Sequence, residues 1–184
     1  MHAWQLDTAC RALVQGNIIA YPTEAVYGLG CLPAAGPVEQ LLKIKRRSVR
    51  KGLILIAATP LQLAPYVYFP DVDSCERVLP TWPGPVTWLL PARPGLPSWL
   101  TGEYSTLAVR VSAHPVVQAL CLAAGPLIST SANPANQPPA LNRQQLRSYF
   151  GSKLAYIVPG ALGGRQRPTA ILDGCSGQVV RSGG

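Results

Sequence analysis

Short apolar runs alternate with longer stretches of helical periodicity along this chain, and that alternation restricts its fold more than any other feature. The longer stretches repeat apolar residues every three or four positions, and they cover residues 3–15, 37–46, 114–123 and 141–150. The apolar runs are three to five residues long, and they cover residues 18–21, 53–57, 86–90, 107–111, 127–129, 155–158, 170–172 and 178–181. The first pattern is typical of amphipathic helices and the second of buried strands. Strands that alternate with helices predict an α/β domain with a mixed sheet.

The composition favours one compact domain over residues 1–184. Hydrophobic residues make up 48% of the chain and charged residues 13%, and a charged fraction this low argues against disorder. Sixteen Lys and Arg against eight Asp and Glu give a net charge of +8. Such a charge favours a ligand that carries phosphate, either a nucleotide or a nucleic acid, although it also fits a solubilising surface.

The cysteines and the apolar runs predict a cytoplasmic protein without a membrane segment. The five cysteines form no CxxC pair and the chain has two histidines, which argues against a zinc site and a disulfide framework. The N-terminus has no basic segment followed by an apolar stretch, as a signal peptide would. The longest apolar run, residues 53–58, is too short to span a membrane.

The segment Tyr21–Gly30 is the first candidate for ligand binding. An apolar run ends there in polar residues, among them Thr23, and Gly28-Leu29-Gly30 follows. Open α/β sheets bind ligands in loops after their strands, and glycine lets the backbone approach a ligand closely. An ordinary turn with positive φ is the commoner explanation of two such glycines, and Thr23 could equally cap that turn.

The second candidate is Lys43–Lys51, in which six of nine residues are cationic. Like charges at this density repel one another, and a bound polyanion would relieve the repulsion. Lys45 and Arg47 are two residues apart, so they share a face only where the chain leaves helical geometry. Cations at a helix C-terminus also complement the helix dipole, which is the alternative explanation. The sequence has no P-loop motif.

The third candidate is Arg110, which interrupts the apolar run at residues 107–111. A buried guanidinium needs an anionic partner. Because the chain has only eight acidic residues, a ligand carboxylate is an attractive partner. An arginine that faces water from an edge strand, or one in a structural ion pair, explains the pattern equally well.

Two further segments combine strands with polar groups. Ser129-Thr130-Ser131-Ala132-Asn133 follows the apolar pair at 127–128, and a basic glycine-rich segment at 163–169 leads into the run at 170–172. Hydroxyls and amides at a strand end can bind phosphate or sugar oxygens, but they also occur in ordinary turns. Phosphoryl and nucleotidyl transfers need mainly positioning and charge stabilisation, which these residue types supply.

Together these segments resemble the YrdC family of threonylcarbamoyl-AMP synthases in its short single-domain form. The resemblance extends from Asn17 to Arg181. It rests on five motifs in a fixed order: PTE-x-x-YGLG at 22–30, K-x-R at 45–47, PGPVT at 83–87, LAVR at 107–110 and S-x-N at 131–133.

The resemblance implies a twisted mixed sheet with a basic concave groove. It also implies that threonine, bicarbonate and ATP become threonylcarbamoyl-AMP and pyrophosphate, for modification of the tRNA adenosine next to the anticodon. Magnesium would be bound through the ATP phosphates, with no metal site built by the protein. The implied partners are the tRNA threonylcarbamoyl-transfer machinery and tRNA or another structured RNA.

The family's functional residues carry over to ten positions of this chain. The resemblance implies catalytic and nucleotide-binding roles for Lys45 and Arg47. It implies nucleotide binding by Thr106, Ser129, Ser131, Asn133 and Arg181, and threonine binding by Thr23, Arg110 and Thr169. The chain departs from the family pattern at Ser48, Ala135-Asn136 and Thr169.

Two other functions compete with this interpretation. The net charge also fits a non-enzymatic protein that binds structured RNA, but contact with a phosphate backbone does not require neutral polar residues such as Thr23, Ser131 and Asn133. A carbamoyl-transfer module of hydrogenase-maturation proteins is the other alternative. Those proteins have additional domains and CxxC motifs that this sequence lacks.

Overall fold

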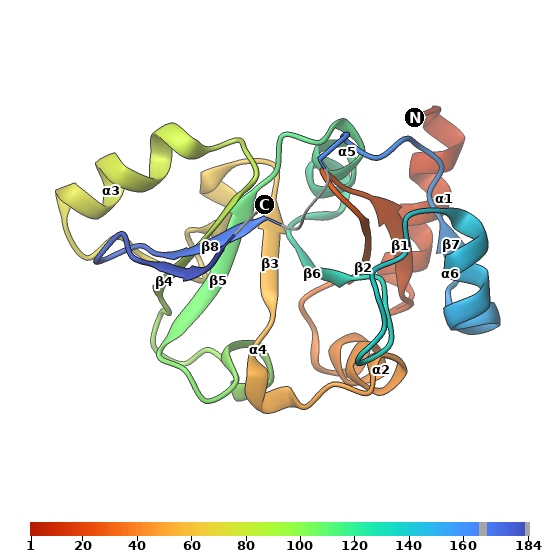
Figure 1. Cartoon of the computed structure of the whole chain (residues 1–184), viewed down its shortest axis with the longest axis horizontal. Helices are drawn as coiled ribbons and strands as arrows, with labels where there is room; N and C mark the ends of the chain where they lie inside the picture. Colours follow the sequence, from red (N-terminus) through yellow and green to blue (C-terminus); the bar gives the residue numbers. More distant parts are fainter. Residues whose placement is uncertain (166–168, 183–184) are drawn as a thin grey trace.

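The computed structural model describes residues 1–165 and 169–182, and nine strands within these residues form one mixed sheet (Figure 1). The strands are β1 (Ile19–Pro22), β2 (Tyr27–Cys31), β3 (Ile54–Ala57), β4 (Val86–Pro91), β5 (Thr106–Val111), β6 (Leu127–Ser131), β7 (Tyr156–Ile157), β8 (Ala170–Asp173) and β9 (Val179–Arg181). Their order is β7-β1-β2-β6-β3-β5-β4-β8-β9. The pairs β1–β7, β3–β5 and β4–β8 are parallel, and the other neighbours are antiparallel. The sequence-based prediction of an α/β domain with a mixed, twisted sheet is confirmed.

Helices cover both faces of this sheet. The α-helices are α1 (Ala3–Val14), α2 (Ala35–Lys45), α3 (Val72–Val78), α4 (Ser98–Thr101), α5 (Pro115–Ala124) and α6 (Arg143–Phe150). Short 3-10 turns lie at η1 (Val49–Lys51), η2 (Pro60–Leu63), η3 (Leu79–Thr81) and η4 (Gly151–Lys153). Within the described ranges, no helix is both long enough and apolar enough to cross a membrane.

Neighbouring residues of one strand pack into two different cores, because side chains alternate between the two faces of a sheet. On β1, Ile19 and Tyr21 pack in the smaller core with α1 and α5, whereas Ala20 belongs to the larger core with α2 and α6. β1 and β3 therefore lie between two layers of helices, which explains why their sequences are almost continuously apolar.

The Gly28-Leu29-Gly30 segment lies in strand β2, and the loop predicted there is wrong. Neither glycine has positive φ, so the alternative explanation by a turn is also wrong. A Cβ atom on Gly30 would lie 2.7 Å from Cε1 of Tyr21 and 2.9 Å from the carbonyl oxygen of Ile128. Glycine is needed here because the Tyr21 ring crosses over β2.

The chain leaves helical geometry between Lys45 and Arg47, which is the condition under which the two side chains could share a face. Helix α2 ends at Lys45, and Arg46 adopts a left-handed conformation with φ of 52°. Most other predicted elements are present with boundaries shifted by one or two residues. α3 and α4 were not predicted, since they have only seven and four residues and too few turns to show a periodic pattern.

Candidate active site

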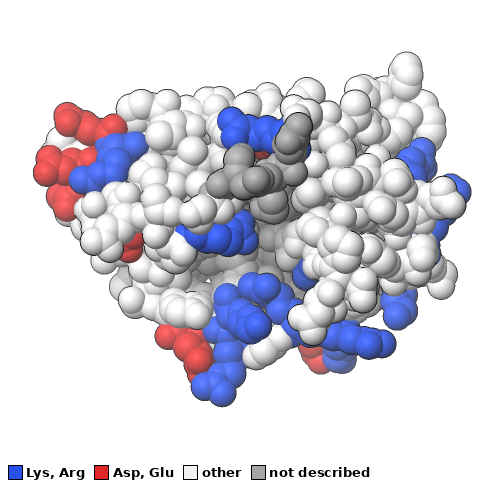
Figure 2. Space-filling view, in the orientation of Figure 1, with Lys and Arg blue, Asp and Glu red and all other residues white. Residues whose placement is uncertain are grey.

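A cavity of about 390 Å³ opens on the sheet face that α1 and α5 cover elsewhere. Ile56 and Leu127 pack in the core with α5, whereas Ile54 and Ser129 line the cavity. Each pair of strand residues is two positions apart and therefore faces the same side. The sheet itself thus forms the floor of the cavity. Figure 2 shows this hollow with Lys and Arg side chains around it, as expected for a basic concave groove.

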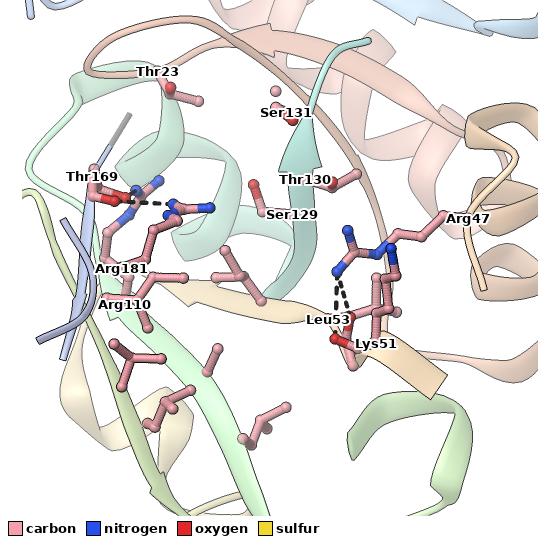
Figure 3. A pocket seen from close by; sticks show the side chains of 18 of the residues that line it. Thr23, Arg47, Lys51, Leu53, Arg110, Ser129, Thr130, Ser131, Thr169 and Arg181 are labelled. Carbon is pink, nitrogen blue, oxygen red and sulfur yellow. Dashed lines mark hydrogen bonds between the residues drawn. The ribbon is translucent and has the colours of Figure 1, made fainter. Parts of the chain in front are cut away.

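Eight of the ten expected site residues line this cavity: Thr23, Arg47, Thr106, Arg110, Ser129, Ser131, Thr169 and Arg181. Arg110, Thr169 and Arg181 lie on one side, which we call the Arg110 side (Figure 3). Arg47 and Lys51 lie opposite, on the Arg47 side, and Ser129 and Ser131 of β6 lie between the two. Among the described residues, no Asp or Glu lines the cavity.

Lys45 and Asn133 lie behind the cavity and do not line it. The Lys45 ammonium donates to the carbonyl oxygens of Ser131, at 2.5 Å, and Asn133, at 2.8 Å, and to Asn133 Oδ1 at 3.4 Å. The Ser131 hydroxyl also donates to Asn133 Oδ1, at 2.6 Å. Burial, and to a lesser degree the charge of Arg47, lower the pKa of Lys45 to about 8. Lys45 therefore fixes the end of β6 that presents Ser131 to the cavity.

Arg47 reaches the cavity from the turn that follows α2. Its NH2 group donates to the carbonyl oxygens of Gly52, at 3.0 Å, and Lys51, at 3.4 Å. Its buried Nε has no hydrogen-bond partner among the described residues. Burial, followed by the charge of Arg181, lowers the pKa of Arg47. An arginine whose charge is disfavoured by a second arginine across the cavity is suited to bind an anion between the two.

Arg110 lies on β5, which is an interior strand, and its burial rules out an arginine that faces water from the sheet edge. NH1 donates to Thr169 Oγ1 at 2.9 Å. NH2 lies 3.4 Å from Oε2 of Glu24, so the protein itself supplies one anionic partner of this guanidinium. Arg110 Nε has no hydrogen-bond partner in the described parts of the chain. The expected carboxylate of a ligand would thus share this guanidinium with Glu24.

Two further hydroxyls of the site are also held by the protein itself. The Ser129 hydroxyl accepts a hydrogen bond of 2.9 Å from the buried Tyr21 hydroxyl, whose pKa is raised by burial. Tyr21 therefore stays protonated and remains a donor. The Thr23 hydroxyl donates to the Val26 carbonyl oxygen at 2.7 Å. Thr23 accordingly both stabilises a turn and lines the cavity, so the two explanations of this residue are compatible.

The segment at 163–169 approaches the same site, although residues 166–168 lie outside the described residues. The Gly163 amide donates to the Thr23 carbonyl oxygen at 2.9 Å, and the Arg165 amide to that of Glu24 at 3.0 Å. The segment therefore packs directly on the turn that carries Thr23.

Comparison with known proteins shows which family this chain belongs to. A family model described as "Telomere recombination", which covers the Sua5, YciO and YrdC proteins, matches residues 11–183. The chain belongs to the Sua5/YciO/YrdC family.

Relatives of this Sua5/YciO/YrdC protein match both its sequence and its fold. A protein of Nitrosococcus oceani named threonylcarbamoyl-AMP synthase is 51% identical over 180 residues, 97% of each chain. Sua5 of P. abyssi, solved in complex with L-threonine, has a TM-score of 0.92 and 26% identity. The match covers 100% of this chain but 55% of that one, so the chain spans about half the length of that Sua5. YciO of E. coli has a TM-score of 0.86 at 25% identity, and the match covers 99% and 90% of the two chains.

Sequence reasoning on this Sua5/YciO/YrdC protein missed several cavity residues. Lys51, Thr130 and Tyr104 also line the cavity. Lys51 and Thr130 lie inside the two polar segments that were singled out, but Tyr104 lies in an irregular stretch with no pattern. The contact between Glu24 and Arg110 joins residues 86 positions apart in the chain, so no local spacing could reveal it.

Proposed function

We propose that the chain makes L-threonylcarbamoyl-AMP and pyrophosphate from L-threonine, bicarbonate and ATP. Relatives about half identical over nearly their whole length carry the name of this synthase, and this is the observation that carries the proposal. The cavity supports it, because cations lie on two sides with hydroxyls between them. One side suits a carboxylate and the other a chain of phosphates.

The Arg110 side is the proposed site for threonine. Arg110 would bind the threonine carboxylate through its planar fork, which suits a carboxylate better than a lysine ammonium does. Thr169 accepts a hydrogen bond from Arg110, and Thr23 lines the same cavity. These two hydroxyls support binding of the rest of the amino acid.

The Arg47 side and the β6 hydroxyls are the proposed site for ATP. Arg47, Ser129, Ser131 and Thr106 would contact the nucleotide directly, and Arg181 would reach it from the Arg110 side. Lys45 and Asn133 would act from behind, because Lys45 holds the strand end that presents Ser131.

The proposed reaction has two steps. The threonine nitrogen forms a bond to the carbon of CO2 and gives up a proton, which yields a carbamate. With bicarbonate in place of CO2, a C–O bond of bicarbonate also breaks, and the oxygen leaves as water with the proton from the amine. A carbamate oxygen then attacks the α-phosphorus of ATP in line, and the bond from that phosphorus to the pyrophosphate oxygen breaks. Arg47 would offset the negative charge that develops on the phosphates. Positioning and charge dominate such a transfer, so the absence of acidic residues from the described cavity lining is compatible with it.

Magnesium fits this site through the substrate. The described residues gather no group of three His, Cys, Asp or Glu side chains that could hold a metal ion. We infer that phosphate oxygens and water supply the ligands, as is usual for Mg²⁺ in nucleotide sites. The ion would add positive charge at the phosphates.

The product would pass to the tRNA threonylcarbamoyl-transfer machinery. We place this activity in the cytoplasm, since all five cysteines are free thiols and such thiols persist in a reducing compartment.

Direct contact with tRNA is a second candidate function, favoured by the exposed Arg46 and Lys51 near the cavity. RNA affinity measured from low to high salt tests this contact, because binding through phosphates falls steeply as salt rises.

One experiment tests the proposed activity. Purified protein is incubated with threonine, bicarbonate and ATP, and pyrophosphate and the carbamoyl-adenylate are measured. Both products should form together, and omission of any one substrate should abolish both. Pyrophosphate release that does not depend on threonine would contradict the proposal. RNA binding without either product would favour the non-enzymatic alternative.

A further inference from the structure

Glu24 is a buried acidic residue directly behind the Arg110 side of the cavity. Its side chain is 9% exposed and does not line the cavity, although Thr23 and Ala25 on either side of it do. Glu24 Oε1 accepts a hydrogen bond of 2.6 Å from the Ser112 hydroxyl, which itself accepts one of 3.1 Å from the His114 amide. These bonds fix the carboxylate in position.

The other carboxylate oxygen faces Arg110. Glu24 Oε2 lies 3.4 Å from Arg110 NH2, which is longer than a strong charge-assisted hydrogen bond. Oε2 has no hydrogen-bond partner in residues 1–165 and 169–182. Both side chains are more than nine-tenths buried, so solvent screens their charges little. A charge on a ligand held directly against Arg110 would lie within the field of this buried pair.

We propose that Glu24 is a specificity-determining residue, which makes the Arg110 side select a zwitterionic amino acid over a monoanion. The inference rests on the proposed function, in which Arg110 binds the threonine carboxylate. The α-ammonium of an amino acid lies two bonds from its carboxylate carbon. A ligand held by Arg110 therefore carries its positive charge close to Glu24, which attracts it.

The same carboxylate disfavours small anions. Arg110 and Arg181 are near enough for the charge of Arg110 to lower the pKa of Arg181, after the larger effect of burial. Two cations without Glu24 would bind phosphate, bicarbonate or a hydroxy acid as readily as an amino acid. Glu24 offsets one of these charges and so removes much of that attraction.

A purely structural role of Glu24 makes a different prediction. If Glu24 only held Arg110 in place, loss of Glu24 would lower the affinity for every ligand of Arg110 by the same factor. If the charge of Glu24 selects the ligand, loss of that charge should weaken the binding of a zwitterion more than the binding of an anion of the same shape. The ratio of two affinities therefore separates the two roles.

The test compares L-threonine with its hydroxy-acid analogue, in which a hydroxyl replaces the amine. Calorimetry on the full chain at neutral pH gives a Kd for each ligand. The wild type should prefer threonine. In Glu24→Gln, which keeps the shape and removes the charge, this preference should shrink on the order of tenfold or more. Glu24→Ala is a second variant without the charge and should shrink it similarly.

Ser112→Ala is the matched control, because it removes the hydrogen bond to Oε1 and leaves both charges in place. Ser112→Ala should lower the affinity for both ligands and leave the preference for threonine unchanged. Glu24→Asp keeps the charge and should also retain this preference. An unchanged preference in folded Glu24→Gln or Glu24→Ala overturns the inference while threonine binding stands. If the wild type binds no threonine, the proposed function fails instead.

Discussion

The Tyr21 hydroxyl donates a 2.9 Å hydrogen bond to Ser129 across strand β2, which separates their two strands in the sheet. Gly30 leaves the space for this contact. Gly30→Ala should therefore displace the Tyr21 ring and destabilise the fold by about 1–3 kcal/mol, as overpacking does in other cores. Thermal denaturation should show a melting temperature lowered by at least about 2 °C, and ATP binding should weaken because Ser129 loses its donor.

Gly36→Ala is the control for this substitution. Gly36 lies in α2, and a Cβ atom there would meet nothing within 4 Å. Alanine should be neutral or slightly stabilising at this position, because it favours the helix. Equal melting temperatures for the two alanine variants would contradict the account of Gly30.

Arg47→Ala should lower kcat/KM about ten- to hundredfold, because it removes a charge-assisted contact to the phosphates. The protein should stay folded, since among the described residues the Arg47 side chain bonds only to carbonyl oxygens of the neighbouring turn. Arg50→Ala is the matched variant. Arg50 lies in the same cationic segment, but it pairs with Glu103 at the surface, so its kcat/KM should stay within about twofold of the wild type. Equal losses in both variants would point to general charge rather than to a site.

Arg110→Lys should strongly raise the Kd for threonine and leave the Kd for ATP largely unchanged. A lysine keeps the positive charge but cannot present a planar fork to the carboxylate and also reach Thr169 and Glu24. Calorimetry with each ligand separately measures the two effects. Loss of ATP affinity with retained threonine affinity would assign Arg110 to the nucleotide site.

Lys45 should make stability rise with pH above neutrality. Its pKa is lowered to about 8 in the folded state and is about 10.4 in an unfolded chain. Between these values the unfolded state binds more protons, so the free energy of unfolding increases as pH rises from about 8 to 10. Below pH 8 the buried charge carries its full cost.

Urea unfolding of the wild type and Lys45→Met checks this expectation. Methionine has a similar length and no charge, so other titrating groups cancel in the comparison. The stability of the wild type relative to the variant should increase by about 1–3 kcal/mol over this range. Parallel pH profiles for the two proteins would show that Lys45 titrates normally.

Much of this fold could be predicted from the sequence because buried strands and amphipathic helices leave periodic patterns. β3, β5 and β6 were identified with boundaries shifted by one or two residues. β2 was missed, since its two glycines are typical of turns. Their reason is the Tyr21 ring, which reaches β2 from a neighbouring strand, and contacts between strands have no signature within one strand.

The candidate site was predicted from composition at strand ends and from family resemblance. Serine-rich and arginine-rich segments indicated polar groups that the structure brings around one cavity. Sequence reasoning could not tell that Lys45 lies behind this cavity and Arg47 in it, because the left-handed Arg46 decides which side chain points inward. Sequence reasoning also could not decide whether Arg110 pairs with a carboxylate of a ligand or with an acidic residue of the protein. The structure shows that Glu24, in the turn between β1 and β2, is a structural partner of Arg110.

The position of β9 at the edge of the sheet has a consequence for biosynthesis. Arg181 lies on β9, which pairs only with β8 within the described sheet, whereas Thr23 follows β1. The ribosome makes the chain from its N-terminus, so β1 and β2 can pair long before residue 181 emerges. A nascent chain therefore lacks one of the cations of the cavity until residue 181 has emerged, and before that point its site for substrates is incomplete.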